Sequence, residues 1–396
     1  MSASVWKKCK LSQFATIYSG TDYKHNKKGE LFPIIGTGGV MGFTGEYLNE
    51  GPAVLTGRKG TIDKPLYVEG KFWNVDTIFC IKPFDDTDIK LFYYAISNKN
   101  LSTLNEATGV PSVSSDNLYK LAFTFPTDIN EQKRIASILS TCDTMIQKTQ
   151  STIEKYKAIK QGMMQDLFTR GLTKDGKLRP SFKEAPEHYK ECELGLIPKE
   201  WEVKSFSDIG RLSMCKRVFQ YETKSEGEIP FYKIGTFGGI PDAYISKKLY
   251  ENYKNSFAYP KKGDILISAS GTIGRTVIFD GQPAYFQDSN IVWLEHNESK
   301  IINQYLFYLY KTITWNLEGS TIKRLYNDNF NNIIIAFPSD LSEQTAIASR
   351  LSSIDTTIQK EEALLAKYKK IKNGLMNDLL VPPKGATIID ETGDAE

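Results

Sequence analysis

The sequence is poor in the residues that build metal sites and disulfide frameworks. It has five cysteines and three histidines among 396 residues, and no two cysteines form a CxxC pair. An odd number of widely spaced cysteines disfavours both disulfides and a cysteine zinc site. The histidines, His25, His188 and His296, stand alone, without a second ligand at metal-binding spacing. We therefore expect no bound metal and a cytoplasmic location.

Long apolar segments are absent as well. No run approaches the roughly 18 apolar residues that a membrane-spanning helix needs. The opening residues, MSASVWKKCKLSQF, lack the apolar core of a signal peptide. The sequence therefore predicts no contact with a membrane.

The chain also lacks a strong excess of positive charge and a recognisable catalytic motif. Its 50 Lys and Arg residues face 47 Asp and Glu, a formal charge of +3 that is low for a protein holding DNA by bulk charge alone. The segment LTGRKGT lacks the spacing of a phosphate-binding loop, and no GxGxxG turn is present for S-adenosylmethionine. We predict that the chain is not an enzyme and binds no cofactor.

What the sequence does contain is an internal repeat. The segment DNLYKLAFTFPTDINEQKRIASILSTCDTMIQK begins at Asp116, and DNFNNIIIAFPSDLSEQTAIASRLSSIDTTIQK begins at Asp328, 212 residues later. The match continues without a gap to Leu167 and Leu379, and about half of the aligned positions are identical. Helical composition alone does not produce such a match, so the chain holds two copies of one unit.

Each copy predicts one long helix, over residues 128–170 and 339–381. Asp128 with Glu131, and Asp340 with Glu343, have the spacing of capping boxes, in which the glutamate reaches back to the start of the helix. Apolar residues then recur at alternating steps of three and four, which is the stripe of a coiled coil and requires a partner helix. The stripe residues are Ile135, Leu139, Ile146, Ile153, Tyr156 and Leu167 in the first helix, and Ile347, Leu351, Ile358, Leu365, Tyr368 and Leu379 in the second.

The path of the chain predicts how the two helices pair. Gly171 ends the first helix and Pro382-Pro383 ends the second. The first helix carries the chain away from the first domain and the second returns it. We therefore expect an antiparallel pair that relates the halves by an approximate two-fold axis. Lys160 and Lys372 interrupt both stripes at the same place, either as lysines at the edge of the stripe or as residues that set the register.

The remaining residues predict two mixed α/β domains, over residues 1–127 and 201–338. In each, two strands flank a Gly-Thr-Ile turn, in GPAVLTGRKGTIDKPLYV and GDILISASGTIGRTVIFD. Short helices are expected at DIKLFYYAISN and NQYLFYLYKTI. The charged, proline-containing residues 171–200 are typical of a linker, and residues 382–396 form a tail. The fold class is therefore α+β, with two such domains in a tandem pseudo-two-fold repeat, separated by a pair of long antiparallel coiled-coil helices.

Taken together, these features resemble the specificity subunits of type I restriction–modification systems. The resemblance rests on the duplicated FP…EQ…IA helix starts, on TRGLTKDGKLRPS after the first helix and on ELGLIPKEWEV before the second domain. It covers nearly the whole chain. It implies that each domain reads one half of a split target on double-stranded DNA, and that the helices set the spacing and dock two methyltransferase subunits. It also implies that S-adenosylmethionine and ATP bind partner subunits, and it allows for a nuclease or translocase subunit.

For DNA contact we predict exposed basic and polar residues in the glycine turns and in the loops that precede the repeated segments. Arginine and lysine bond guanine edges or phosphates, and a glycine-rich turn lets the backbone approach the duplex. The alternative for these turns is an ordinary solvated hairpin. The candidates are Arg58, Lys59, Lys64, Ser112 and Ser114 in the first domain, and Arg275, Lys323, Arg324 and Asn327 in the second.

A different class of function fits the same pattern. A coiled-coil scaffold whose end domains bind proteins also needs two long helices and two compact domains. Base-specific protection of DNA, by the chain alone or with a methyltransferase partner, distinguishes the two hypotheses.

Overall fold

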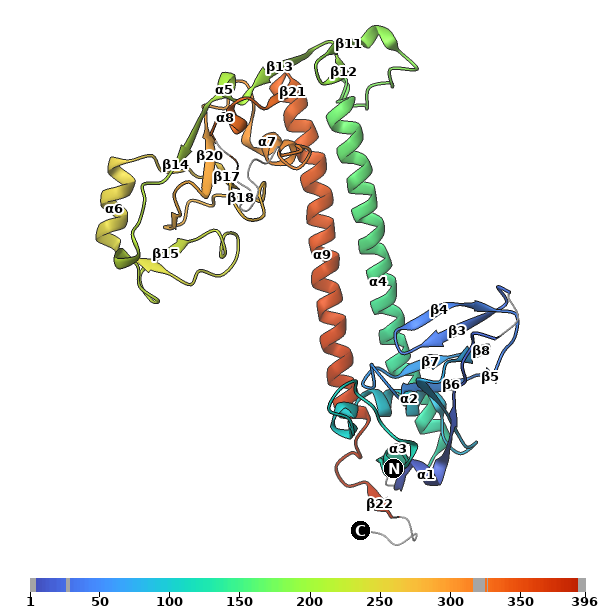
Figure 1. Cartoon of the computed structure of the whole chain (residues 1–396). Coiled ribbons are helices and arrows are strands. Elements are labelled where there is room, and N and C mark those ends of the chain that lie inside the picture. Colours follow the sequence, from blue (N-terminus) through green and yellow to red (C-terminus); the bar gives the residue numbers. More distant parts are fainter. Residues whose placement is uncertain (1–4, 26–28, 316–324, 326, 391–396) are drawn as a thin grey trace. The chain divides into compact units, whose positions relative to one another are not determined.

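The computed structural model describes residues 5–25, 29–315, 325 and 327–390. The chain divides into two compact units, one formed by residues 1–152 with 361–396 and the other by residues 153–360. Each unit therefore holds one α+β domain, the start of the long helix that follows that domain, and the end of the other long helix (Figure 1).

The two long helices are α4 (Ile129–Thr169, 41 residues) and α9 (Leu341–Leu379, 39 residues). In the first unit, Leu139 of α4 shares a core with Met376 of α9. In the second, Leu351 of α9 shares a core with Leu167 of α4. The start of each helix thus lies beside the end of the other, and the predicted antiparallel pair is confirmed. Gly171, with φ of +65°, follows the end of α4, a backbone angle that favours glycine.

The capping boxes form only in part. The carboxylate Oδ1 of Asp128 accepts a hydrogen bond from the N–H of Asn130 at 2.9 Å, and that of Asp340 accepts one from Ser342 at 2.8 Å. Hydrogen bonds from the Ser342 hydroxyl and backbone lower the pKa of Asp340. The prediction that Glu343 reaches back to the start of α9 is wrong, because a buried arginine from the preceding segment binds this carboxylate instead.

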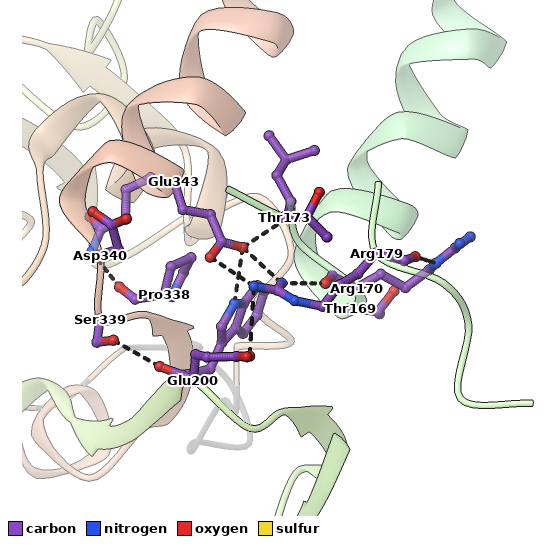
Figure 2. Close-up of polar contacts among 12 residues, drawn as sticks. Thr169, Arg170, Thr173, Arg179, Glu200, Pro338, Ser339, Asp340 and Glu343 are labelled. Carbon is purple, nitrogen blue, oxygen red and sulfur yellow. Dashed lines mark hydrogen bonds and ion pairs between the residues drawn. The ribbon is translucent and has the colours of Figure 1, made fainter. Parts of the chain in front are cut away.

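That arginine, Arg179, belongs to the segment for which the sequence predicted a linker. Its guanidinium donates two hydrogen bonds to Glu343, at 3.0 and 3.1 Å, and both side chains are almost fully buried. The same carboxylate accepts hydrogen bonds from the indole of Trp201 at 3.2 Å and from the N–H of Leu172 at 2.8 Å (Figure 2). A side chain at Gly171 would clash with this carboxylate. The segment between the repeats is thus packed against the start of α9.

The stripe residues differ in how deeply they are buried. Those near the ends of the helices contribute to the cores of the two domains. Ile135, Leu139, Ile153, Leu167, Ile347, Leu351 and Ile358 are buried, and Ile146, Tyr156, Leu365, Tyr368 and Leu379 are half-buried.

The described residues of the first unit form three sheets. Strand β6 (Ala53–Gly57), inside the four-stranded sheet, is an uninterrupted run of apolar and small residues that is buried along its whole length, as expected for the middle of a packed sheet. The four-stranded sheet has the order β2 (Ala15–Ser19), β9 (Ile78–Pro83), β6 (Ala53–Gly57), β7 (Leu66–Val68). The second has the order β4 (Gly39–Thr44), β3 (Phe32–Gly36), β8 (Lys71–Asn74), β5 (Asn49–Glu50), and the third β10 (Ala122–Pro126), β1 (Val5–Lys10), β22 (Thr387–Ile389).

The second unit repeats the four-stranded sheet and divides its other strands among smaller sheets. Its four-stranded sheet has the order β14 (Arg211–Met214), β20 (Ile291–Glu295), β17 (Ile265–Ser268), β18 (Thr276–Ile278), which matches the first unit strand for strand. The smaller sheets are β16 (Tyr244–Ile245), β15 (Ile229–Tyr232), β19 (Tyr285–Phe286); β13 (Trp201–Ser205) with β21 (Ile334–Pro338); and the hairpin β11 (Tyr189–Cys192), β12 (Gly195–Pro198). The structural repeat therefore extends through domains whose sequences diverge.

Short helices complete both domains. Both predicted short helices are present, α2 over Ile89–Ser97 and α7 over Asn303–Leu309. The others are α1 (Leu11–Phe14) and α3 (Ser115–Tyr119) in the first unit, and α5 (Phe206–Ile209), α6 (Lys247–Ser256) and α8 (Asn327–Asn331) in the second. Among the described residues, no helix combines the length and hydrophobicity needed to cross a membrane.

A buried glutamine fastens the first domain to its helix. The side-chain amide of Gln132, in the first turn of α4, donates to the carbonyl of Pro126 at 2.8 Å and to that of Asp86 at 3.2 Å. Its oxygen accepts from the N–H of Asp88 at 2.7 Å. These bonds satisfy backbone groups of the strand and loop that lead into the helices.

The second domain uses the equivalent glutamine in the same way. The amide of Gln344, fully buried in the first turn of α9, donates to the carbonyls of Pro338 and Lys300, both at 2.8 Å. Its oxygen accepts from the N–H of Ile302 at 2.9 Å. The glutamine of the repeated Glu-Gln pair thus has the same role in both copies: it joins each domain to its long helix.

Candidate nucleic-acid interface

The first candidate surface is the turn at residues 57–64, which connects β6 to β7. Its glycines are required by geometry: a side chain at Gly57 would clash with the backbone of Thr61, and Gly60 has φ of +90°. The turn presents Arg58, Lys59 and Lys64, all three exposed to solvent. A tight turn with three projecting cations is suited to phosphate oxygens and to guanine edges.

The loop at residues 105–114 lies directly against this turn. The N–H of Val113 donates to the carbonyl of Arg58 at 3.0 Å, and Lys59 and Ser112 form a β-bridge. Two segments that lie about 50 residues apart, and were predicted separately, are thus brought together by backbone pairing. We call residues 57–64 and 105–114 together the first face.

Ser114 has a structural role within the first face. Its hydroxyl donates to the carboxylate of Glu106 at 2.6 Å, and it accepts from the N–H of Asn117 as the N-cap of α3. Hydrogen bonds from the Ser114 hydroxyl and backbone lower the pKa of Glu106, so this carboxylate is ionised at neutral pH. The loop is therefore held in one conformation by its own polar groups, and Ser112 is the better placed of the two predicted serines.

The second unit has the equivalent turn at residues 268–275. Gly271 and Gly274 have φ of +65° and +82°. Arg275 is exposed, but its guanidinium also donates to the carbonyl of Ile234 at 2.8 Å and lies 5.3 Å from the ring centroid of Phe237. Arg275 therefore joins this turn to the turn at residues 233–239, and only part of its donor set faces solvent.

Of the other predicted residues in the second domain, only Asn327 lies in the described part of the chain. Lys323 and Arg324 fall outside the described residues. Asn327 is the first residue of α8 and is exposed. Leu325 donates its N–H to the carbonyl of Ala269 at 2.9 Å, the same contact that Val113 makes in the first unit. Leu325, within the predicted loop, is therefore a neighbour of the turn in this unit too.

A stacked aromatic pair was not predicted from the sequence. Phe219 and Tyr221 have ring centroids 5.6 Å apart with planes 6° from parallel, and they are 46% and 83% exposed. Arg217, two residues earlier, forms an ion pair with Asp288 at 2.8 Å. The signal in the sequence was KRVFQYETK, where basic residues flank two aromatic residues. We call residues 216–221 with the turn at 268–275 the second face.

Cys80 and Cys215 are buried and are not activated as nucleophiles. Burial raises the pKa of Cys80 to about 11 and that of Cys215 to about 12, which keeps both thiols protonated. In the part of the chain that the structure describes, no group of three or more His, Cys, Asp or Glu side chains is placed to hold a metal ion.

Comparison with known proteins assigns the family. The model of the type I restriction modification DNA specificity domain matches residues 4–156 and 198–370, once for each half of the chain. A Haemophilus influenzae protein named as a type I restriction enzyme specificity subunit is 36% identical over 329 residues, covering 82% of this chain and 80% of that protein. A type I restriction enzyme specificity subunit of Methanocaldococcus jannaschii is 30% identical over 312 residues, covering 74% and 69%.

Solved structures agree on the fold. The S subunit of the type I restriction-modification system from M. genitalium superposes with a TM-score of 0.66 at 16% identity, covering 97% of this chain and 98% of that one. A second structure, of a type I restriction–modification system, gives a TM-score of 0.51 at 13% identity, with 96% and 98% covered. With two family-domain matches, the relatives and the repeated α+β fold, this chain belongs to the type I restriction–modification DNA specificity subunits.

Proposed function

We propose that each α+β domain reads one half of a split target in double-stranded DNA, and that α4 and α9 set the distance between the halves. The observation that carries this proposal is the repeated sheet. In both units the third and fourth strands of the same four-stranded sheet are joined by a glycine turn with exposed basic side chains. Two similar reading surfaces on one chain fit a target made of two separated parts.

A specificity subunit is the non-catalytic component of its enzyme and carries no cofactor of its own. In our proposal the helix pair docks two methyltransferase subunits, and these partners bind S-adenosylmethionine. A nuclease or translocase subunit that uses ATP joins the assembly where restriction occurs. Because the proposed substrate is the DNA of the cell, the chain would act in the cytoplasm.

On the first face, Arg58, Lys59 and Lys64 would contact the duplex, with Ser112 beside them. The exposed cations and the closely approaching glycine backbone support this assignment. In the second domain, Arg275 on the second face and the exposed Asn327 would contact the duplex, and Lys323 and Arg324 remain sequence-based candidates. Because the two faces carry different side chains on a similar backbone, the two halves of the target would differ in sequence.

The second face would also use its aromatic pair. Phe219 and Tyr221 are exposed although burial of aromatic rings is favourable, and cations flank them in the chain. Apolar or aromatic side chains that enter a base step widen the contact with bent DNA. The two rings already stack on each other, and the nearby Arg217 is held by its ion pair with Asp288.

The test uses the chain with its methyltransferase subunits. Sequencing of methylated sites is expected to return one split target, with a fixed number of base pairs between its halves. Arg58→Ala should weaken methylation through the half-site read by the first domain, while Lys7→Ala, a matched loss of one exposed charge on β1, should not. Unsplit or sequence-independent methylation would contradict the proposal. Failure of any target to be protected would favour the scaffold hypothesis.

A further inference from the structure

One polar cluster in the first unit connects three helices that are far apart in the sequence: α2, α4 and α9. The hydroxyl of Tyr94, on α2, donates to Oδ2 of Asp143, on α4, at 2.7 Å. The ammonium of Lys372, on α9, lies 2.5 Å from Oδ1 of the same carboxylate and 5.2 Å from the centroid of the Tyr94 ring. We call Tyr94, Asp143 and Lys372 the first clasp. It joins the domain, its own long helix and the other long helix.

The second unit contains the same cluster. The hydroxyl of Tyr308, on α7, donates to Oδ2 of Asp355, on α9, at 2.9 Å. The ammonium of Lys160, on α4, lies 2.5 Å from Oδ1 of Asp355 and 5.8 Å from the Tyr308 ring centroid. We call Tyr308, Asp355 and Lys160 the second clasp.

The two clasps agree in chemistry and in register. Asp143 and Asp355 are equivalent residues of the repeat, as are Lys160 and Lys372. The step from aspartate to lysine is the same on both helices, so both ion pairs form in a single antiparallel register. In both clasps, burial and the hydrogen bond to aspartate raise the tyrosine pKa, so the hydroxyl remains a donor at neutral pH.

The rest of the seam does not select a register so strictly. Apolar residues repeat along both stripes, and a slip of one heptad replaces one apolar contact by another. The same slip moves one helix along the other by about 10 Å, and even one helical turn moves it by about 5 Å. Because the lysine and the aspartate of a clasp lie on different long helices, such a shift moves the ammonium out of hydrogen-bond distance of the carboxylate and breaks the clasp. A polar residue within an apolar seam is the usual device that specifies register.

We infer that the two clasps fix the axial register of α4 against α9 and hold each reading domain to that register. This inference rests on the proposed function, because it concerns the spacer between the two half-sites. A slip of about 5 Å corresponds to roughly 1.5 base pairs, at 3.4 Å of rise for each. The clasp residues are therefore positioning residues for the spacer of the target, and they act through the helices without touching DNA.

The tyrosines give the clasp its second part. A lysine–aspartate pair alone would align the two helices without involving the domains. Tyr94 and Tyr308 come from the short helices of the domains, so the carboxylate that fixes the register also binds the domain. Lys160 and Lys372 interrupt the stripes because each provides the cation of a clasp.

The experiment changes the aspartates rather than the lysines, because a second lysine lies close enough to the second clasp to replace the one removed. The ammonium of Lys311 lies near this clasp: partial desolvation and the nearby Lys160 lower its pKa, while Asp355 opposes the shift. It could therefore replace a missing Lys160. The test variant is Asp143→Asn with Asp355→Asn, which keeps side-chain size and removes both charges. The matched control is Glu154→Gln with Asp378→Asn, the same type of change at exposed positions of α4 and α9.

The full chain with its methyltransferase subunits is given a DNA library in which both half-sites are constant and the spacer varies in steps of one base pair. We expect the wild type, the control and Lys160→Arg with Lys372→Arg to methylate one spacer. The double asparagine variant should methylate neighbouring spacers about tenfold more, relative to the native spacer, because two partly buried ion pairs no longer select the register. The half-site sequences should stay the same.

The single variants Asp143→Asn and Asp355→Asn each retain one clasp and should give intermediate selectivity. Unchanged spacer selectivity in a folded double variant overturns the inference, and so does an equal loss of methylation at every spacer. A wild type without a split target would instead end the proposed function. A wild type with a split target beside an equally selective double variant would end this inference alone.

Discussion

The carboxylate of Glu343 accepts hydrogen bonds from three residues at the junction between the two repeats. Glu343→Ala would remove the partner of the Arg179 guanidinium and of the Trp201 indole, at 3.0 and 3.2 Å. The N–H of Leu172 would lose its acceptor as well. We expect the second unit to be strongly destabilised, because these donors lie in a region closed to water.

The magnitude follows from burial. Only 6% of the Arg179 side chain and 10% of the Glu343 side chain are exposed. Removing one partner of a buried ion pair costs about 3–5 kcal/mol, since the remaining charge is left without compensation. The other carboxylate near Arg179, that of Glu200, lies 3.7 Å away and is mostly exposed, so it offsets little. Glu343→Gln keeps the oxygen that accepts from Leu172, Trp201 and Arg179 and loses the second bond to Arg179, so its cost should be about 1–2 kcal/mol.

Urea unfolding followed by tryptophan fluorescence measures the effect. With a slope of about 1–3 kcal/mol per molar urea, Glu343→Ala should lower the midpoint of the second unit by about 1–3 M. The control is Glu154→Ala, an exposed glutamate of the same unit, which should change the free energy of unfolding by less than about 0.5 kcal/mol. A Glu343→Ala midpoint no lower than that of Glu154→Ala would refute the reasoning.

Three further outcomes are expected. Gln344→Leu leaves the N–H of Ile302 unpaired and should lower the free energy of unfolding by about 2–4 kcal/mol, against almost no change for the exposed Gln150→Leu, both read by urea midpoints. Arg58→Ala should weaken DNA binding by about 1–3 kcal/mol in a titration with the first half-site, and unchanged affinity would remove it from the interface. Replacing residues 201–338 with the matching domain of a relative should change one half of the target in methylated-site sequencing; changes in both halves would mean that the domains do not read independently.

The long helices were predictable because their signal is local and repeated. Apolar steps of three and four, together with a match over the whole of each helix, indicate the elements directly. The antiparallel pairing followed from the path of the chain. The partners of Lys160 and Lys372 were not predictable, because they depend on which residues of the other helix face them in one register. The tyrosines of the clasps come from domain segments of different length, so they fall outside the simple repeat.

The role of Glu343 illustrates a second limit. Its spacing from Asp340 is that of a capping box, and this spacing alone predicts a bond back to the start of the helix. A charge almost fully buried 164 residues away in the chain competes for the same carboxylate, and a buried guanidinium binds it more strongly than an exposed helix terminus does. Burial in the folded chain thus decides whether Glu343 binds the start of its own helix or Arg179, a choice that sequence spacing alone does not make.

The candidate interface was predictable in part for a related reason. Glycine turns with basic residues are visible in the sequence, and the structure places Arg58, Lys59 and Ser112 together. The stacking of Phe219 on Tyr221 depends on a single turn of 3-10 helix at Gln220–Glu222, which no periodicity announces. The repeat of the two four-stranded sheets is likewise hidden, because strand order survives changes of sequence that remove the similarity.

The most direct test of the two-domain reading mechanism is sequencing of methylated sites in DNA treated with this chain and its methyltransferase subunits. We predict one split target, with two unlike halves at a single spacing, and loss of only the first half when Arg58 and Lys59 are both changed to Ala. A continuous target, or loss of both halves together in that variant, would contradict two independent reading domains held at a fixed distance.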